Sequence, residues 1–75
     1  MQRYANRSGH SGVVAYELGA DSITVKFTGG DRYLYTEDST GAAHIARMRE
    51  LAESGRGLST YISQHVRDRY ARKLD

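Results

Sequence analysis

The pair Gly29-Gly30 lies between two stretches of alternating side chains, and this arrangement limits the chain to folds built around a β-hairpin. Residues 23–27 and 33–35 each place a β-branched or aromatic side chain at every second position, which is the period of a half-buried strand. Two consecutive glycines followed by Asp31 can adopt the positive φ angles that a tight turn requires. We therefore expect two antiparallel strands joined by this turn.

Residues 14–18 alternate in the same way, and the turn-forming residues 19–22 separate them from the strand at 23–27. The sequence therefore predicts a three-stranded antiparallel meander. Its apolar face is expected to consist of Val14, Tyr16, Leu18, Ile23, Val25, Phe27, Tyr33 and Tyr35. Val13 and Leu34 then fall on the opposite, mostly polar face. The tyrosines of the apolar face are expected to pack in the core rather than to bind a ligand.

A sheet with one apolar face needs a covering layer, and the second half of the chain supplies two predicted helices. The first is expected to begin at an N-cap among residues 38–40, to end before Gly55, and to bury Ile45, Met48, Leu51 and Ala52. The second carries an apolar stripe of Leu58, Ile62 and Val66 and is expected to continue through Lys73. The predicted fold class is α+β: a three-stranded antiparallel β-meander followed by two α-helices packed on one face of the sheet.

At 75 residues the chain is predicted to hold one small domain over residues 11–75, preceded by a flexible basic arm over residues 1–10. Without Cys it forms no disulfide, no thiolate metal site and no thiol nucleophile. No stretch approaches the ~20 apolar residues of a membrane span, and the arm lacks the apolar segment of a signal peptide. We therefore expect a cytoplasmic location and no membrane partner.

The residues that could support catalysis do not form a recognisable pattern. His10, His44 and His65 are widely separated, and no serine lies in a G-x-S-x-G elbow. His10 falls in the predicted arm, whereas His44 and His65 fall on different helices and are expected to pack at the edge of the core. The glycine-containing segments match neither common phosphate-binding loop. We expect no enzymatic activity, no cofactor and no metal site.

The small net charge of +2 conceals an uneven distribution of charge along the chain. Residues 1–10 and 44–75 carry an excess of basic side chains, whereas residues 11–43 carry an excess of acidic ones. Arginine outnumbers lysine nine to two, and its forked guanidinium is suited to phosphate. Such asymmetry indicates an anionic partner, although a solvated, salt-bridged surface would have the same composition.

The densest cationic segment is residues 65–73, which also contains Tyr70. Cations beside aromatic rings are typical of proteins that bind nucleic acid. We predict a non-catalytic module that contacts RNA or DNA, including tRNA, through an Arg-rich C-terminal helix. The predicted nucleic-acid-binding residues are Arg67, Arg69, Arg72, Lys73, Arg56 and Arg32. Arg56 is included because it lies beside the predicted start of the second helix, and helix N-termini attract anions.

The ordered motifs of the chain resemble one known family. The series Ile23-x-Val25-x-Phe27-x-x-Gly30-x-x-Tyr33-x-Tyr35, followed by a helix and by Tyr61-Ile62-x-x-x-Val66-Arg67-x-x-Tyr70, is similar to the KTSC domain. That family is named for the C-terminal extension of certain lysyl-tRNA synthetases and also occurs as short stand-alone proteins. The resemblance covers about residues 11–70. It implies a β-β-β-α-α fold and binding of nucleic acid.

The match to the family's pattern is incomplete. The matching positions are Ser11, Gly30, Tyr33, Tyr35, Arg67 and Tyr70. The helix after the Tyr-x-Tyr motif usually follows a proline in the family, and residues 36–38 replace it here. A Ser-x-Gly motif before the last helix becomes Gly57-Leu58-Ser59, which falls beside Arg56 and weakens the case for an anion site there.

A protein-interaction module is the alternative function. A three-stranded sheet leaves its edges open to an added strand. Val13 and Leu34, on the predicted polar face, would give that face an apolar patch. The partner would then be another protein or a second copy of the chain, as in a homodimer.

Overall fold

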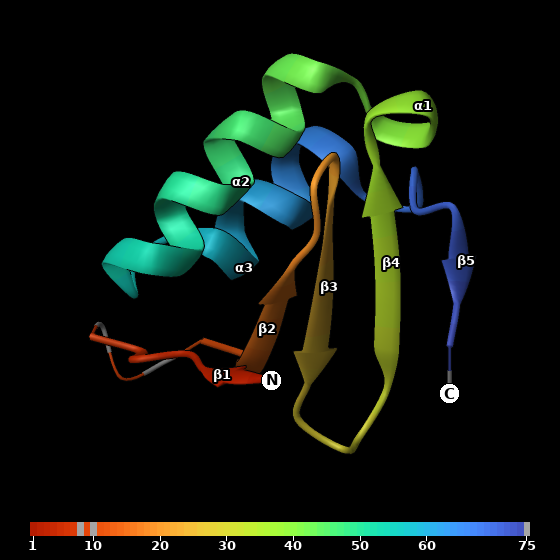
Figure 1. Ribbon diagram of the computed structural model, residues 1–75. Coiled ribbons are helices and arrows are strands. Elements are labelled where there is room, and N and C mark those ends of the chain that lie inside the picture. The colour runs from red at the N-terminus through yellow and green to blue at the C-terminus, as the bar shows by residue number, and fades with distance from the viewer. Residues whose placement is uncertain (8, 10, 75) are drawn as a thin grey trace.

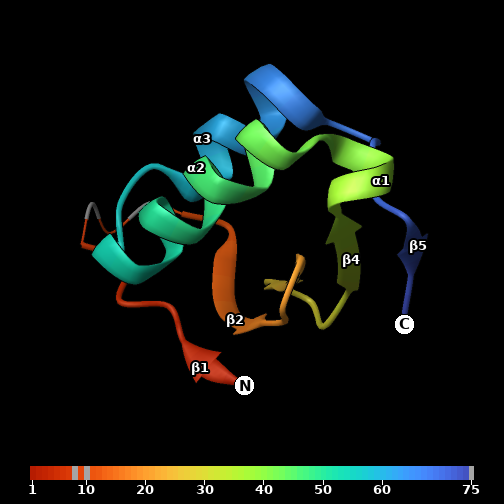
Figure 2. The same ribbon diagram turned by 45° about the horizontal axis from the view of Figure 1, so that its top comes forward.

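The structure, a computed structural model, describes residues 1–7, 9 and 11–74. The fold is α+β, with an antiparallel sheet of five strands in the order β1-β2-β3-β4-β5 and its helices on one side of the sheet (Figure 1, Figure 2). The strands are β1 (Gln2–Arg3), β2 (Val13–Leu18), β3 (Ser22–Phe27), β4 (Arg32–Thr36) and β5 (Arg72–Lys73). The helices are α1 (Glu37–Thr40), α2 (Ala42–Ser54), α3 (Leu58–Tyr61) and the π-helix η1 (Ile62–Val66).

The predicted hairpin joins β3 to β4 at the two glycines. Gly29 and Gly30 both adopt φ of 99°, a conformation that side chains with a Cβ rarely reach. The backbone N–H of Phe27 donates to the carbonyl oxygen of Asp31 at 2.8 Å, which closes the turn. The register pairs Ile23 with Tyr35, so these side chains share the face that the helices cover.

The start of β2 departs from simple alternation. The pairing of β2 with β3 shifts register between Val13 and Ala15, as happens at a β-bulge. A one-residue shift reverses which side chains face the core. Val13 is fully buried, whereas Val14 is 39% exposed. The prediction that Val14 faces the core and Val13 the opposite face was therefore wrong.

The first predicted helix is divided in two. Thr36 caps α1 through a capping box with Ser39, in which each side chain accepts from the other residue's backbone N–H at 3.1 Å. Gly41, at φ of 109°, interrupts the helical backbone before α2 begins. The helix α2 ends at Gly55, which adopts the left-handed conformation typical of a C-terminal glycine.

The second predicted helix ends well before Lys73, so the prediction of an Arg-rich C-terminal helix was wrong. After η1, Arg67 adopts φ of 44° and ψ of −111°, and the chain turns back toward the sheet. The backbone N–H of Ala71 then donates to the carbonyl oxygen of Leu34 at 2.6 Å, and that of Leu74 donates to Arg32 at 2.7 Å. The apolar stripe stops at Val66, so a longer helix would bury nothing more, whereas β5 satisfies the free edge of β4.

The predicted arm contributes to the sheet and to the core. Gln2 and Arg3 pair with β2, and Tyr4 is 3% exposed. The Tyr4 hydroxyl accepts a hydrogen bond from the backbone N–H of Leu58 at 3.2 Å. Arg7 donates its backbone N–H to the carbonyl oxygen of Gly55 at 2.8 Å. The prediction for residues 8 and 10, including His10, lies outside the described residues.

The core fills the space between the sheet and the helices. Its buried apolar residues are Tyr4, Val13, Tyr16, Ile23, Val25, Tyr35, Ile45, Met48, Ala52, Leu58, Ile62 and Val66. The helices cover one side of the sheet, and none of the described residues forms a layer over the opposite face (Figure 2). Within the described part of the chain, no helix has the length and apolar character needed to cross a membrane.

Candidate nucleic-acid interface

The short strand β5 brings predicted site residues to the edge of the sheet. It pairs Arg72 with Leu34 and Lys73 with Tyr33. Cross-strand partners point to the same face. Arg72 therefore lies on the uncovered face with Leu34, whereas Lys73 lies on the helix side with Tyr33.

The uncovered face carries a row of cations across the strands. The register pairs Arg3 with Ala15, Ala15 with Lys26, and Lys26 with Arg32. Successive strands are about 4.8 Å apart, so these side chains form one line across the sheet. Arg72 extends the positive charge toward β5, and Glu17 is the acidic residue that the strand register adds to this face. We call this surface the open face.

The predicted nucleic-acid-binding residues did not include Lys26 or Arg3, two members of the open face. The alternation of residues 22–27 already placed Lys26 on the polar side of the strand, directly across the hairpin from Arg32. That signal was available in the sequence. Arg3 could not have been found in this way, because nothing in residues 1–10 predicted a strand.

On the helix side, the same edge contains a cavity of about 330 Å³, which we call the tyrosine cavity. Its lining residues are Phe27, Asp31, Tyr33, Tyr35, Ile62, Arg67, Asp68 and Tyr70. The rings contact one another in series: Phe27–Tyr33 centroids are 5.7 Å apart, Tyr33–Tyr70 4.7 Å and Tyr35–Tyr70 6.2 Å. Tyr35 is buried as predicted, but Tyr33 and Tyr70 are only partly buried.

Lys73 and Asp31 form an ion pair at the rim of the tyrosine cavity. The Nζ atom of Lys73 lies 3.5 Å from an oxygen of Asp31 and 6.0 Å from the ring centroid of Tyr33. Both members of the ion pair are about half exposed, so it contributes little to stability. It does keep Lys73 beside the aromatic rings.

Three arginines of this region are free of internal partners. Among residues 1–7, 9 and 11–74, the exposed side chains of Arg67, Arg69 and Arg72 make no hydrogen bond or ion pair. The backbone of Arg69 is nevertheless fixed, because the buried Thr40 donates its hydroxyl to the Arg69 carbonyl oxygen at 2.7 Å. The guanidinium groups are thus presented from a positioned backbone and remain available to an anion.

Arg56 does not belong to this group. It lies in the loop between α2 and α3, at the end of the molecule away from β5 (Figure 1). The helix α3 that follows has four residues and begins after Gly57, without a side-chain cap. The structure therefore separates Arg56 from the other five predicted residues.

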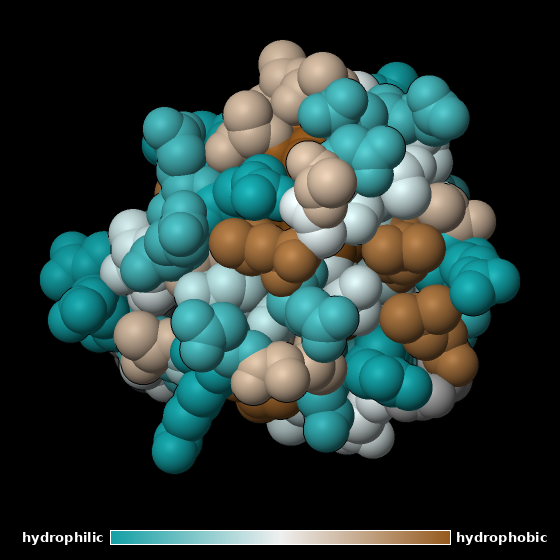
Figure 3. Space-filling view, in the orientation of Figure 1, coloured by the Kyte–Doolittle hydropathy of each residue, from teal (hydrophilic) through white to brown (hydrophobic). Residues whose placement is uncertain are grey.

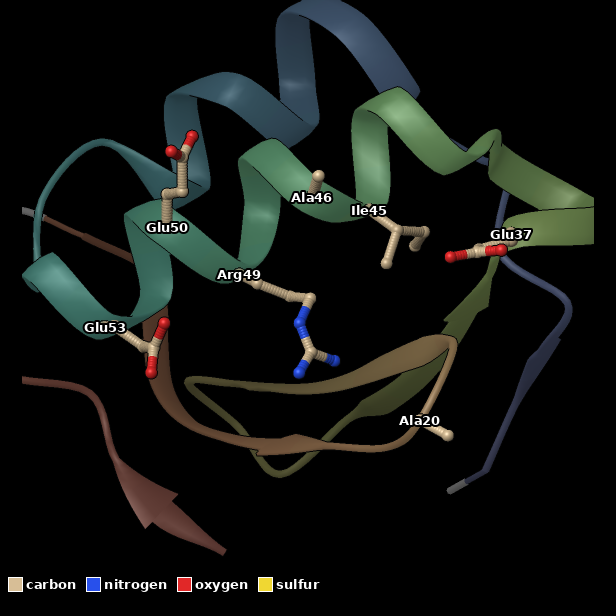
Figure 4. A pocket seen from close by; sticks show the side chains of 7 residues that line it. All are labelled: Ala20, Glu37, Ile45, Ala46, Arg49, Glu50 and Glu53. Carbon is tan, nitrogen blue, oxygen red and sulfur yellow. The ribbon is translucent and has the colours of Figure 1, made fainter.

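The depression beside α2 has the opposite chemical character (Figure 4). Glu37, Glu50 and Glu53 line a volume of about 380 Å³ around Arg49. The Arg49 guanidinium points away from them toward the β2–β3 turn, where it donates to the carbonyl oxygen of Gly19 at 2.6 Å. Glu50 is paired with Arg47 at 3.3 Å, and Glu37 and Glu53 add negative charge that would repel phosphate from this depression.

The histidines on the helices form a polar cluster with Tyr61. The Nδ1 atom of His44 lies 2.6 Å from the Tyr61 hydroxyl, and the Tyr61 and His65 rings are 4.5 Å apart. Within the described residues, no group of three His, Cys, Asp or Glu gathers as metal ligands would. The cluster packs α2 against η1.

The buried end of the tyrosine cavity gives a prediction for pH dependence. Burial, with smaller contributions from Tyr33 and Tyr70, raises the pKa of Tyr35 from 10.0 to about 12. Because the folded state holds this proton more tightly than the unfolded chain, its contribution to stability is complete below pH 10 and is lost toward pH 12. We expect the free energy of unfolding to fall by about 2–3 kcal/mol across this window.

Urea denaturation at a series of pH values measures this fall in the free energy of unfolding, and Tyr35→Phe should lack the part of it that comes from Tyr35. An equal decline in both proteins would contradict the assignment.

Comparisons with known proteins identify no relative. A scan against protein-family models and searches of curated proteins and of solved structures found no match to this chain.

Proposed function

We propose that this protein is a small non-catalytic module that binds single-stranded RNA or DNA at its β4–β5 edge. The observation that carries the proposal is the set of three arginines, Arg67, Arg69 and Arg72, whose side chains have no partner among the described residues. Arg67 also lines the tyrosine cavity with the partly buried rings of Tyr33 and Tyr70, whereas Arg72 lies on the open face. Guanidinium groups bind phosphate through forked hydrogen bonds. Aromatic faces stack on bases that are not already paired.

The open face supports the same proposal. Arg3 and Lys26 extend the positive charge from the edge across the sheet. A strand bound at the edge can therefore continue along this face with its phosphates near cations. The resemblance of the sequence to the KTSC domain points in the same direction, and tRNA offers suitable single-stranded loops and ends.

Binding of another protein is less well supported. Both edge strands have two residues, and the cationic side chains on them, one on β1 and two on β5, disfavour the addition of a further strand. Val13, expected in the apolar patch on the sheet, is buried, and Val14 is exposed instead. In the view of Figure 3 the hydrophobic residues form separate small patches among hydrophilic ones. These features favour a polyanion over an apolar protein surface, including that of a second copy.

The salt dependence of binding tests the proposal. A fluorescently labelled oligo-U of about 12 nucleotides is titrated by anisotropy between about 50 and 200 mM NaCl, and the logarithm of the affinity should fall with a slope of about −0.7 per contacted phosphate. A slope of about −2 to −3 is expected for three or four contacts. The matched duplex should bind more weakly, because its bases are not free to stack. The proposal fails if the oligonucleotide does not bind at the lowest salt or binds equally at all concentrations.

A further inference from the structure

We infer that the tyrosine cavity binds one guanine base of the bound strand, recognised by Arg67 and Asp68. This inference rests on the proposed function and assigns a base preference to it. The cavity volume of about 330 Å³ is at the lower end of the range for small-ligand sites, which suits a single base. Its lining includes the aromatic residues Phe27, Tyr33 and Tyr70, against whose rings a planar base can stack.

The polar groups at the rim define which base fits. Arg67 and Asp68 are adjacent, both are exposed, and both line the cavity. Within the described residues neither side chain has a hydrogen-bond or ion-pair partner. They therefore offer a forked donor and a two-oxygen acceptor to the same ligand.

Guanine is the base that complements both groups. Its O6 and N7 atoms accept a forked pair of hydrogen bonds from a guanidinium. Its N1–H and N2 amine, on the neighbouring edge, donate together to a carboxylate. Adenine lacks the O6 acceptor, cytosine offers the carboxylate an amine but no adjacent N–H, and uracil presents two carbonyl oxygens. Only guanine uses Arg67 and Asp68 at once.

An organic cation is a poorer occupant of this cavity. The Lys73 ammonium already lies near the Tyr33 ring, and it is paired with the other rim carboxylate, Asp31. Arg67 adds a further positive charge to the rim. A second cation would be repelled, although aromatic rings alone would attract it.

The backbone geometry supports a functional role for the turn at Arg67 and Asp68. Arg67 is a non-glycine residue at φ of 44°, and it directly follows the π-helix η1. Uncommon backbone conformations and π-helical turns both occur preferentially at functional sites. Here they place Arg67 and Asp68 at the cavity rather than on a continued helix.

Three nonamers test the inference: uridine throughout, the same with a central guanosine, and the same with a central adenosine. We expect the guanosine probe to bind about tenfold more tightly than either of the others. Asp68→Asn and Arg67→Lys should each bring the ratio of guanosine to uridine affinities close to one. Asp21→Asn removes the same charge at the β2–β3 turn and should leave the ratio at about tenfold.

The possible results separate the two proposals. If the uridine nonamer binds but the guanosine probe has no advantage, or if Asp68→Asn keeps it, the guanine inference is wrong and the proposed function stands. If no nonamer binds at low salt, both fail. If the Tyr33 and Tyr70 resonances shift with tetramethylammonium chloride, relative to equal NaCl, and not with guanosine monophosphate, the cavity is a cation site and the inference is overturned.

Discussion

Replacing Arg67, Arg69, Arg72 and Lys73 together by Gln is expected to lower the affinity for single-stranded oligo-U at least about a hundredfold at about 50 mM NaCl. Each phosphate contact that is lost also removes about 0.7 from the slope of log affinity against log salt, so the slope should shrink by nearly 3. All four side chains are exposed, and within residues 1–7, 9 and 11–74 only Lys73 among them has an ion pair. The variant should therefore remain folded, with its unfolding free energy little changed.

A matched pair of double variants separates a local interface from an effect of total charge. Arg67→Gln with Arg72→Gln removes two charges at the β4–β5 edge. Arg47→Gln with Arg56→Gln removes two charges from α2 and from the loop at its far end. The first should lose about tenfold or more in affinity and the second only about twofold. Equal losses in the two variants would mean that affinity depends on the total charge of the protein and not on a local interface at the β4–β5 edge.

Replacing Tyr4 by Ala is expected to lower the free energy of unfolding by about 3–5 kcal/mol, which is typical for loss of a buried aromatic ring. The total stability of a domain of 75 residues is of the order of 4–11 kcal/mol. The variant should thus lose a large share of the total stability. Urea denaturation followed by circular dichroism measures the difference.

Tyr4→Phe is the control for this substitution, because it keeps the ring and removes only the hydroxyl. The hydroxyl accepts one hydrogen bond from the backbone N–H of Leu58 at 3.2 Å. Loss of that bond should cost about 1–2 kcal/mol. If Tyr4→Ala is as stable as the unchanged protein, Tyr4 contributes nothing to the core and the N-terminal residues behave as the flexible arm predicted from the sequence.

The parts of the fold that follow a repeating pattern could be predicted from the sequence. The alternation in residues 23–27 and 33–35, with two glycines between them, is sufficient to identify the β3–β4 hairpin. The helical spacing of Ile45, Met48 and Ala52 likewise identifies the buried face of α2. These signals are local, because each depends on residues close together in the chain.

The edge strands could not be predicted because their stabilising contacts are distant in sequence. Two residues are too few to show alternation, and β5 exists because Arg72 and Lys73 meet Leu34 and Tyr33. The spacing of Leu58, Ile62 and Val66 correctly indicates helical structure, but nothing in it indicates the turn at Arg67. The bulge in β2 is hidden for the same reason, since register is a property of two strands.

The candidate site was predicted as a set of charges rather than as a geometry. The sequence gives the charge of Arg67, Arg72 and Lys73, but the structure divides these residues between the helix side and the open face. Tyr33 was expected to serve only as core, yet part of it lines the tyrosine cavity. Neither a cavity nor a sheet face can be recognised until distant segments have been brought together.

The pairing of β5 with β4 also has a consequence for the order of folding. It joins the two ends of one long loop that contains all the helices, whereas β2, β3 and β4 are joined by short turns. Contacts between neighbours in sequence form quickly, and closing a long loop costs more entropy and comes later. We expect β5 to dock last, and we expect the amides of Ala71 and Leu74, which flank it, to exchange hydrogen faster than those of β3. If β5 docks last, the edge that carries the arginines is completed only after the rest of the molecule has folded, and partly folded chains do not present it.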